Sequence, residues 1–549
     1  MLDVLSRQGI DENLRFLIVE VSKQVERTHT YLENPSTSLL DSILARDDYI
    51  DHLKNLIQRA CYQQAARPTS NDESAVDVLR TVEIMAANLE RIADFCENIV
   101  RQTSFIEDEA ILVQYNLVKY FNEVYAGLSL TTEALFNLDT NLALRICRAE
   151  NNLDQLYRDD LHDIIERLTT GEDARSLVTC MFIAHYLERM GDSLLNIGEA
   201  ILSAKLGQRI KIGQLRSLEE SLSNLGFPYS INTISLQHVA DTRSGSRIDR
   251  VINRQPEGTD RMLIFKEGQR QKLLEEREGI ARWDELIPGL APEVYAFTER
   301  GDTGALLFEF LPGETLEQIL LSGQGSTLDR ALGRLAETLS FVWRETRRDG
   351  EVCACFVEQM AARIDDVFAL HPEFRESGGA IGDIEVISYD TLIGRAQELE
   401  ISLQAPFSVL IHGDFNVDNI IYEASEDRVR FVDLHRSEML DYAQDVSVFL
   451  VSNHRLQVFD TPIRERINDV MRIFLDFACD FARSAGDETF EARLALGLAR
   501  SFATSVRFVL DDRFAKSMFL RSRYLLEQLT SHDVDALHGF RIPREAILD

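Results

Sequence analysis

The sequence is poor in positive charge, in paired cysteines and in long apolar runs. Its 549 residues hold 91 Asp and Glu against 58 Lys and Arg, a formal net charge of −33. Because a phosphate backbone needs a basic footprint, this balance argues against a nucleic-acid-binding protein, and equally against electrostatic docking on an anionic membrane. Seven dispersed cysteines without metal-finger spacing fit a reducing compartment better than a disulfide framework. With no apolar stretch of 18 residues and no signal-like start, we expect a cytoplasmic protein that is not an integral membrane protein.

Proline and glycine are scarce in residues 1–215, which predicts long amphipathic helices there. Beyond Leu225-Gly226-Phe227-Pro228 the chain changes to short β-like runs, and helical patterns dominate again toward the C-terminus. We therefore expect a multidomain protein with a boundary between about 210 and 228: an all-α domain of residues 1–215 followed by a second domain of residues 216–549.

The N-terminal domain repeats itself. One helical segment contains Leu89-Glu90-Arg91-Ile92-Ala93-Asp94, and a similar segment contains Leu187-Glu188-Arg189-Met190-Gly191-Asp192. In both, apolar residues alternate at spacings of four and three, which gives the apolar stripe of a helix bundle. Such a duplication predicts two tandem three-helix bundles.

Both copies carry carboxylates four residues apart, and this spacing places them above one another on one helix face. Stacked oxygens suit a hard cation, although the same positions also fit a plain solvent-exposed face opposite the apolar stripe. The candidate metal ligands are Asp47, Asp51, Glu90 and Asp94 in the first copy, and Glu150, Asp154, Glu188 and Asp192 in the second.

At these residues the N-terminal domain resembles PhoU-type phosphate-regulatory proteins, through the segments LERIADFCENI and LERMGDSLLNI. The resemblance covers essentially residues 1–210. It implies two three-helix bundles, surface clusters of iron or zinc, and a role in phosphate regulation. The implied partners are components of a phosphate transporter or of a sensor kinase.

The most specific motif lies in an apolar–polar–apolar segment. It reads His412-Gly413-Asp414, followed by Asn419, and a short strand then ends at Asp433. Phosphoryl transfer from ATP needs a carboxylate that orients the acceptor hydroxyl and takes its proton, and an amide oxygen and a second carboxylate that hold Mg²⁺. Asp414 fits the first role, and Asn419 and Asp433 fit the other two. His412 then braces the loop.

Upstream residues supply candidate nucleotide contacts. Lys266 ends an apolar run, so it can reach nucleotide phosphates from a strand, and Glu278 on the following helix is its expected partner, with Glu275 as competitor. Glu309 lies in the segment LLFEFLPG, which looks like a hinge between lobes. The turn Ser244-Gly245-Ser246 is the candidate phosphate-covering loop, although a simple hairpin turn fits it equally.

From Leu225 onward the chain resembles the aminoglycoside phosphotransferase and choline kinase-like family, through FKEG, LLFEFLPGETL, IHGDFNVDN and FVDLHRSEMLDYAQDVS. The resemblance implies a bilobal α+β protein-kinase-like fold that uses ATP and Mg²⁺, with an N-terminal lobe at about 229–312 and a C-terminal lobe at about 313–549. Asp445 matches the structural aspartate of the family. The segment Val432-Asp433-Leu434-His435 departs from the frequent D-[WF]-E pattern.

These features predict an ATP-dependent phosphotransferase that acts on a hydroxyl of a small molecule, as a monomer or an oligomer, with a PhoU-like regulatory domain. Two alternatives stay open: a non-catalytic phosphate-signalling regulator whose kinase-like domain senses nucleotide, and an aminoglycoside-modifying kinase. Retention of Asp414, Asn419 and Asp433 favours an enzyme, because a nucleotide sensor needs no catalytic base.

Overall fold

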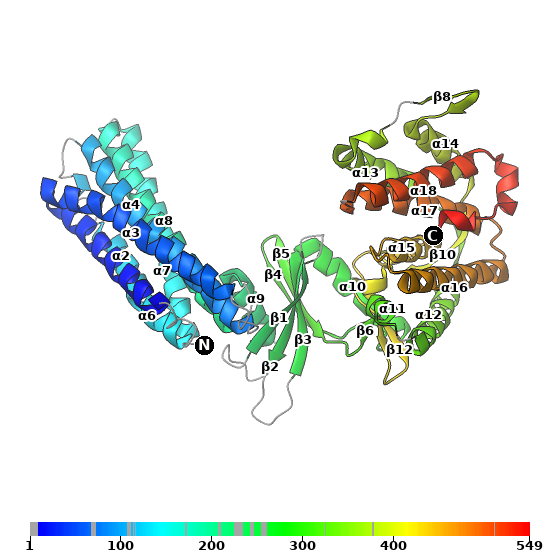
Figure 1. Cartoon of the computed structure of the whole chain (residues 1–549), viewed down its shortest axis with the longest axis horizontal. Coiled ribbons are helices and arrows are strands. Elements are labelled where there is room, and N and C mark those ends of the chain that lie inside the picture. The colour runs from blue at the N-terminus through cyan, green and yellow to red at the C-terminus, as the bar shows by residue number, and fades with distance from the viewer. Residues whose placement is uncertain are drawn as a thin grey trace. The chain divides into compact units, whose positions relative to one another are not determined.

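The computed structural model describes residues 9–66, 73–106, 111–112, 115, 117–170, 173–206, 210–223, 234–241, 246–253, 261–323, 325–375, 378–509 and 511–548. The chain divides into two compact units, Met1–Glu267 and Gly268–Asp549 (Figure 1). None of the helices in these ranges combines the length and the apolar character needed to cross a membrane.

Long helices form most of the first unit (Figure 1). They are α2 (Ile10–Glu33), α3 (Thr37–Ala65), α4 (Glu73–Gln102), η2 (Thr103–Phe105), α6 (Val118–Asn137), α7 (Thr140–Thr169), α8 (Ala174–Leu206) and α9 (Ile212–Ser223). Helices α2, α3 and α4 pack on one another, and so do α6, α7 and α8. The duplicated pattern has therefore folded into two three-helix groups, which join where α4 packs against α8 and α2 against α6.

The apolar stripes of the two repeated helices are buried, with Leu89 and Leu187 fully inaccessible to solvent. Between α4 and α8 the Thr81 hydroxyl donates a hydrogen bond to the Ala200 carbonyl at 3.0 Å. Helices α7 and α8 approach so closely that a Cβ on Gly198 would lie 2.4 Å from a cysteine Sγ of α7. The repeated helices α4 and α8 thus pack closely on their neighbours.

Three antiparallel strands follow the helices: β1 (Ile234–Asp241), β2 (Arg247–Asn253) and β3 (Arg261–Gln269). Lys266 lies on β3 opposite Ile248, and its side chain is only 3% exposed. The division between the compact units falls inside β3, whereas the boundary predicted near residue 215 stays a prediction of the sequence.

The second unit combines small antiparallel sheets with helices. Its strands are β4 (Val294–Arg300), β5 (Thr303–Glu309), β6 (Glu314–Thr315), β7 (Arg348–Val352), β8 (Gly379–Ile381), β9 (Ile384–Val386), β10 (Ala405–Ile411), β11 (Ile420–Glu423), β12 (Arg428–Phe431) and β13 (Glu438–Leu440). Strands β4 and β5 form a hairpin, and β8 and β9 form another. Two three-stranded sheets have the orders β13-β10-β7 and β12-β11-β6. The loop that joins β10 to β11 therefore links the two sheets.

Helices surround these sheets. They are α10 (Arg270–Leu286), α11 (Leu316–Ser322), α12 (Gly325–Glu345), α13 (Phe356–Leu370), α14 (Tyr389–Ser402), α15 (Ala443–His454), α16 (Thr461–Ala485), α17 (Phe490–Ser505) and α18 (Asp512–Thr530), with short 3-10 turns η4 (Pro372–Phe374), η5 (Val417–Asn419), η6 (Val506–Phe508), η7 (Val534–Gly539) and η8 (Arg544–Ala546). Helix α17 is buried along nearly its whole length and packs on α13, α15 and α18. It is the central helix of this unit, so its polar residues are held in fixed positions.

Candidate active site

The loop after β10 carries the predicted motif, and a buried carboxylate fixes its shape. Asp445 of α15 accepts hydrogen bonds from the backbone N–H groups of His412 at 2.7 Å and Gly413 at 2.8 Å. Burial raises the pKa of the Asp445 carboxyl to about 7, against the two N–H groups, which favour its ionised form. Gly413 has a φ of 84°, and a Cβ there would lie 2.2 Å from the Arg436 carbonyl oxygen. Only glycine fits this crossing of the two loops.

His412 links the motif loop to the segment after β12. Its Nε2 lies 3.0 Å from the Val432 carbonyl oxygen, and its Nδ1 lies 3.3 Å from the backbone nitrogen of Asp414. A neutral ring satisfies both contacts, with Nε2–H as donor and Nδ1 as acceptor. Burial lowers the pKa of His412, which also favours the neutral ring. This geometry supports the bracing role expected for His412.

Asn419 and Asp433 lie at the joined ends of the two loops. The Asn419 side-chain amide donates to the Asp414 carbonyl oxygen at 2.9 Å, and the Val432 N–H donates to the Asn419 carbonyl oxygen at 3.1 Å. Asp433 has a φ of 63°, and its Oδ1 lies 3.2 Å from His435 Nδ1. An amide oxygen and a carboxylate here are the donor types that Mg²⁺ prefers, so these residues fit the ion of a nucleotide–magnesium complex.

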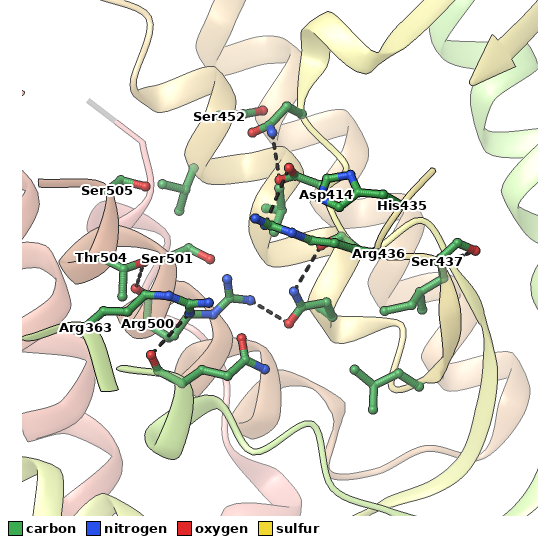
Figure 2. A pocket seen from close by; sticks show the side chains of 18 of the residues that line it. Arg363, Asp414, His435, Arg436, Ser437, Ser452, Arg500, Ser501, Thr504 and Ser505 are labelled. Atoms are coloured by element: carbon green, nitrogen blue, oxygen red, sulfur yellow. Dashed lines mark hydrogen bonds and ion pairs between the residues drawn. The ribbon is translucent and has the colours of Figure 1, made fainter. Parts of the chain in front are cut away.

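The Asp414 carboxylate faces a cavity of about 520 Å³ (Figure 2). Its Oδ1 accepts a hydrogen bond from the Asn416 side-chain amide at 2.9 Å, and its Oδ2 lies 3.5 Å from Arg436 Nη1. Both contacts hold the carboxylate at the cavity wall. A carboxylate so placed can accept a proton from a hydroxyl group bound in the cavity.

Sequence reasoning missed the basic lining of this cavity. Arg436 comes from the loop after Asp433, Arg363 from α13, and Arg500 from α17. Gln444 of α15 lies between the two loops and α17, accepting from Arg500 Nη2 at 2.6 Å and donating to the Gly413 carbonyl at 3.4 Å. One signal was present: Arg493 and Arg500 interrupt the apolar run of α17, where burial of a charge requires a partner.

The upstream acidic residues differ in burial. Glu278 is exposed, Glu275 lines the cavity, and Glu276 is 2% exposed on the face of α10 that packs inward. On the same face a Cβ on Gly279 would lie 2.2 Å from the Leu434 carbonyl oxygen. The buried acid of α10 is thus Glu276, two positions before the predicted Glu278. The pairing of Lys266 with an acid of α10 stays a prediction.

The remaining residues predicted to contact the nucleotide are Glu309 and the turn Ser244-Gly245-Ser246. Arg430 Nη1 and Nη2 donate to the two carboxylate oxygens of Glu309 at 2.9 and 2.6 Å. Although burial opposes it, this bidentate pair lowers the pKa of the Glu309 carboxyl. The Glu309 side chain is therefore engaged within the fold, and its backbone N–H donates to the Glu293 carbonyl at 2.9 Å. Ser246 is buried, and Ser244-Gly245 lies outside the described residues.

In the first helical bundle the predicted carboxylates of α3 and α4 come together around a lysine. Lys54 Nζ lies 2.8 Å from Glu90 Oε1 and 2.6 Å from Asp51 Oδ1. Burial, followed by the neighbouring Glu90 and Asp47 carboxylates, raises the pKa of Asp94 to about 6. These residues are crowded and half-buried, so the simple solvent-exposed face does not describe them.

The second bundle repeats this crowding between α7 and α8. Arg189 lies 2.5 Å from Asp192 and 3.3 Å from Glu188. Burial, together with the Asp154 and Asp192 carboxylates, raises the pKa of Glu150. Within the described ranges, no group of three or more His, Cys, Asp or Glu side chains is arranged to hold a metal ion. The iron or zinc clusters of both bundles therefore stay predictions.

Two protein families match separate parts of the chain. The profile of the PhoU domain matches residues 14–103 and 117–201, and the profile of the phosphotransferase enzyme family matches residues 243–471. Together with the helical bundles and the mixed second unit, these matches confirm the predicted fold class.

Curated relatives match the helical part. The phosphate-specific transport system accessory protein PhoU of Escherichia coli is 29% identical over 198 residues, which are 34% of this chain and 78% of that protein. Its homolog from Clostridium acetobutylicum is 21% identical over 35% of this chain and 88% of that protein.

Solved structures match both parts at 18% identity. PhoU from Pseudomonas aeruginosa has a TM-score of 0.33 and covers 36% of this chain and 95% of its own. An aminoglycoside phosphotransferase from Streptomyces rimosus has a TM-score of 0.32 and covers 58% of this chain and 97% of its own.

Proposed function

Because the chain carries PhoU domains in its N-terminal half and a phosphotransferase-family domain in its C-terminal half, we propose that it transfers the γ-phosphate of ATP to a hydroxyl of a small molecule. The observation that carries this proposal is the Asp414 carboxylate, held at a cavity wall beside Asn419 and the Asp433 segment.

Asp414 orients the acceptor hydroxyl and takes its proton as the oxygen attacks the γ-phosphorus. The bond from that phosphorus to the β–γ bridging oxygen breaks, and ADP leaves with the electron pair. Asn419 and Asp433 are the residues that would hold Mg²⁺, which would supply neutralisation of the phosphate charge. We propose that Lys266 binds the nucleotide phosphates. His412 and Asp445 keep the loop in the shape that presents Asp414.

An ATP-consumption screen of hydroxyl compounds with the purified chain tests this proposal. We expect ADP formation that depends on both Mg²⁺ and one class of acceptor, with a phosphorylated product of matching amount. Nucleotide binding without any turnover would instead favour the regulator that senses nucleotide. Turnover confined to aminoglycosides would favour the drug-modifying kinase.

The helical unit is proposed to regulate this activity in response to phosphate or metal state. Crowded carboxylates with raised pKa values are groups whose repulsion a bound cation would relieve. A ligand of this unit influences the kinase only if it binds two kinase states with different affinity, and typical coupling is roughly 5- to 150-fold.

We expect protein purified without chelator to contain a divalent metal that the double variant Asp94→Asn and Asp192→Asn loses. Elemental analysis measures this, with the exposed neighbour Asp48→Asn as control. Turnover should change when the metal is removed. Protein that holds no metal, before or after titration, would return these carboxylates to a structural role, and equal turnover with and without metal would mean that the units are merely tethered.

A further inference from the structure

The cavity beside Asp414 is lined by arginines, in a chain whose net charge is strongly negative. They come from separate segments of the second unit and converge on one space. The arginines of the lining are Arg363, Arg436, Arg455, Arg500 and Arg507, against the acids Glu275, Asp414 and Glu438. Figure 2 shows Arg363 and Arg500 beside each other, with Arg436 reaching toward them from the side of Asp414.

Two of these cations lack a carboxylate of their own. Within the described part of the chain, no acidic group lies within ion-pair distance of Arg500, whose side chain is 7% exposed. Arg500 donates to Gln444 through Nη2 and lies 5.5 Å from the Phe356 ring, while its Nε has no hydrogen-bond partner among the described residues. The one hydrogen bond that Arg363 donates to a described residue goes to the backbone carbonyl of Gln359, at 3.3 Å. A buried charge without a counterion, as at Arg500, is costly, which indicates that a ligand completes this site.

Neighbouring arginines also make the cations of Arg363 and Arg500 less stable. Burial, and then the Arg363 cation, lowers the pKa of Arg500 to about 10. Burial, and then Arg507 and Arg436, lowers the pKa of Arg363. Each guanidinium group thus lies close to another cation, and an anion bound between them would relieve this repulsion.

Two of the other three arginines are already paired. Arg436 lies 3.5 Å from the Asp414 carboxylate, and Arg507 lies 3.7 Å from Asp366. Because Arg436 lies beside the Asp414 carboxylate, it can contact the phosphate group that is transferred. Arg363 and Arg500 lie on the helices α13 and α17. Asn419 and Asp433, which we propose for the Mg²⁺ of the nucleotide, are not among the lining residues, so we assign this space to the acceptor.

We propose that the acceptor is itself an anion: a small hydroxyl compound that carries a phosphate or carboxylate group, which Arg363 and Arg500 bind while its hydroxyl faces Asp414. This inference rests on the proposed phosphotransferase function. Guanidinium groups bind both kinds of anion through paired N–H donors. The hydroxyl groups of Ser501, Thr504 and Ser505, which line the same wall, offer further contacts to a polyhydroxyl compound. Cationic acceptors such as aminoglycosides and amino alcohols are excluded by the same charges.

Matched acceptors test the inference on the full chain with Mg²⁺ and ATP. Two series compare a neutral, a carboxylate and a phosphate form of similar compounds: glycerol, glycerate and glycerol 3-phosphate, and glucose, gluconate and glucose 6-phosphate. The cationic acceptors for comparison are ethanolamine and kanamycin. We expect turnover with an anionic form at least 10-fold above its neutral counterpart. The ratio of carboxylate to phosphate turnover identifies the anionic group.

Variants locate the anion. Arg363→Gln and Arg500→Gln should each raise the KM for the anionic acceptor roughly 10- to 100-fold, because each removes charge-assisted hydrogen bonds. The KM for ATP should stay within about 2-fold. Arg472→Gln, on the exposed surface of α16, is the matched control. If the buried Arg500 variant does not fold, the half-buried Arg363 variant carries the test.

A binding measurement separates this inference from the proposed function. Calorimetric titration of inorganic phosphate, with ADP and Mg²⁺ present, should detect binding that Arg363→Gln weakens at least 10-fold. Titration of acetate under the same conditions covers a site that prefers a carboxylate. Binding of neither anion, or equal binding by the unchanged protein and Arg363→Gln, overturns the inference, as does a preference for neutral or cationic acceptors. If phosphate binds through Arg363 but no acceptor in either series is phosphorylated, the anion site stands and the phosphotransferase function fails.

Discussion

Asp414→Asn should lose roughly 10²- to 10⁴-fold in turnover while it still binds Mg²⁺ and ATP. The substitution keeps the size of the side chain and removes its ability to take the acceptor proton. The contacts to Asn416 and Arg436 hold only the side chain, so the backbone of the loop remains fixed by Asp445. Single-turnover kinetics with the acceptor found in the screen measure the loss, and calorimetry measures nucleotide affinity.

Asp427→Asn is the matched control for this measurement. Asp427 lies in the turn between β11 and β12 with a φ of 51°, which asparagine tolerates, and its carboxylate pairs with the partly exposed Arg334. Its loss should leave turnover within about 2-fold, because exposed pairs contribute little. Wild-type turnover in Asp414→Asn would show that Asp414 is not the base. A proportional loss of ATP affinity would place the residue on the nucleotide side instead.

The sequence could predict the elements whose signal is local. The repeated LER segments predicted two bundles because an apolar stripe at spacings of four and three is set by the helix period itself. The motif around His412 and Asn419 could also be recognised, because its residues lie on one loop and two of its hydrogen bonds join residues two and five positions apart. Contacts of this short range depend on spacing alone. The bonds of the motif to Val432 and Asp445 reach distant segments and could not be predicted in this way.

Residues brought together from distant segments could not be predicted in the same way. Arg363 and Arg500 meet only because α13 packs on α17, and no motif joins their positions. Glu276 rather than Glu278 is the buried acid of α10, since a shift of two residues turns a side chain to the other face of a helix. Both features depend on tertiary packing, which periodicity in one segment does not determine.

A buried charge network in the second unit also escaped sequence analysis. Arg493 of α17 donates from Nε to Asp441 at 2.8 Å and from Nη2 to Asp487 at 2.7 Å, and the Tyr442 hydroxyl donates to Asp487 at 2.7 Å. The side chains of Arg493, Asp441 and Asp487 are at most 3% exposed. Although burial opposes it, the two carboxylates raise the pKa of Arg493. Asp441 also accepts from the Ala443 N–H at 3.0 Å, at the start of the helix that carries Asp445.

Arg493→Met should therefore destabilise the second unit by about 3 to 5 kcal/mol, because it leaves two buried carboxylates without a counterion. Chemical denaturation measures this through a transition of the second unit separate from that of the helical unit. Arg472→Met, on an exposed position of α16, should cost less than about 0.5 kcal/mol.

The triple variant Arg493→Met, Asp441→Leu and Asp487→Leu should recover part of the loss, since apolar replacement of all three buried charges removes the uncompensated carboxylates. A loss below about 1 kcal/mol in Arg493→Met would mean that water reaches these carboxylates. Turnover should fall in Arg493→Met even where the protein stays folded, because Asp441 holds the first turn of α15 and Asp445, one turn farther along, holds the Asp414 loop.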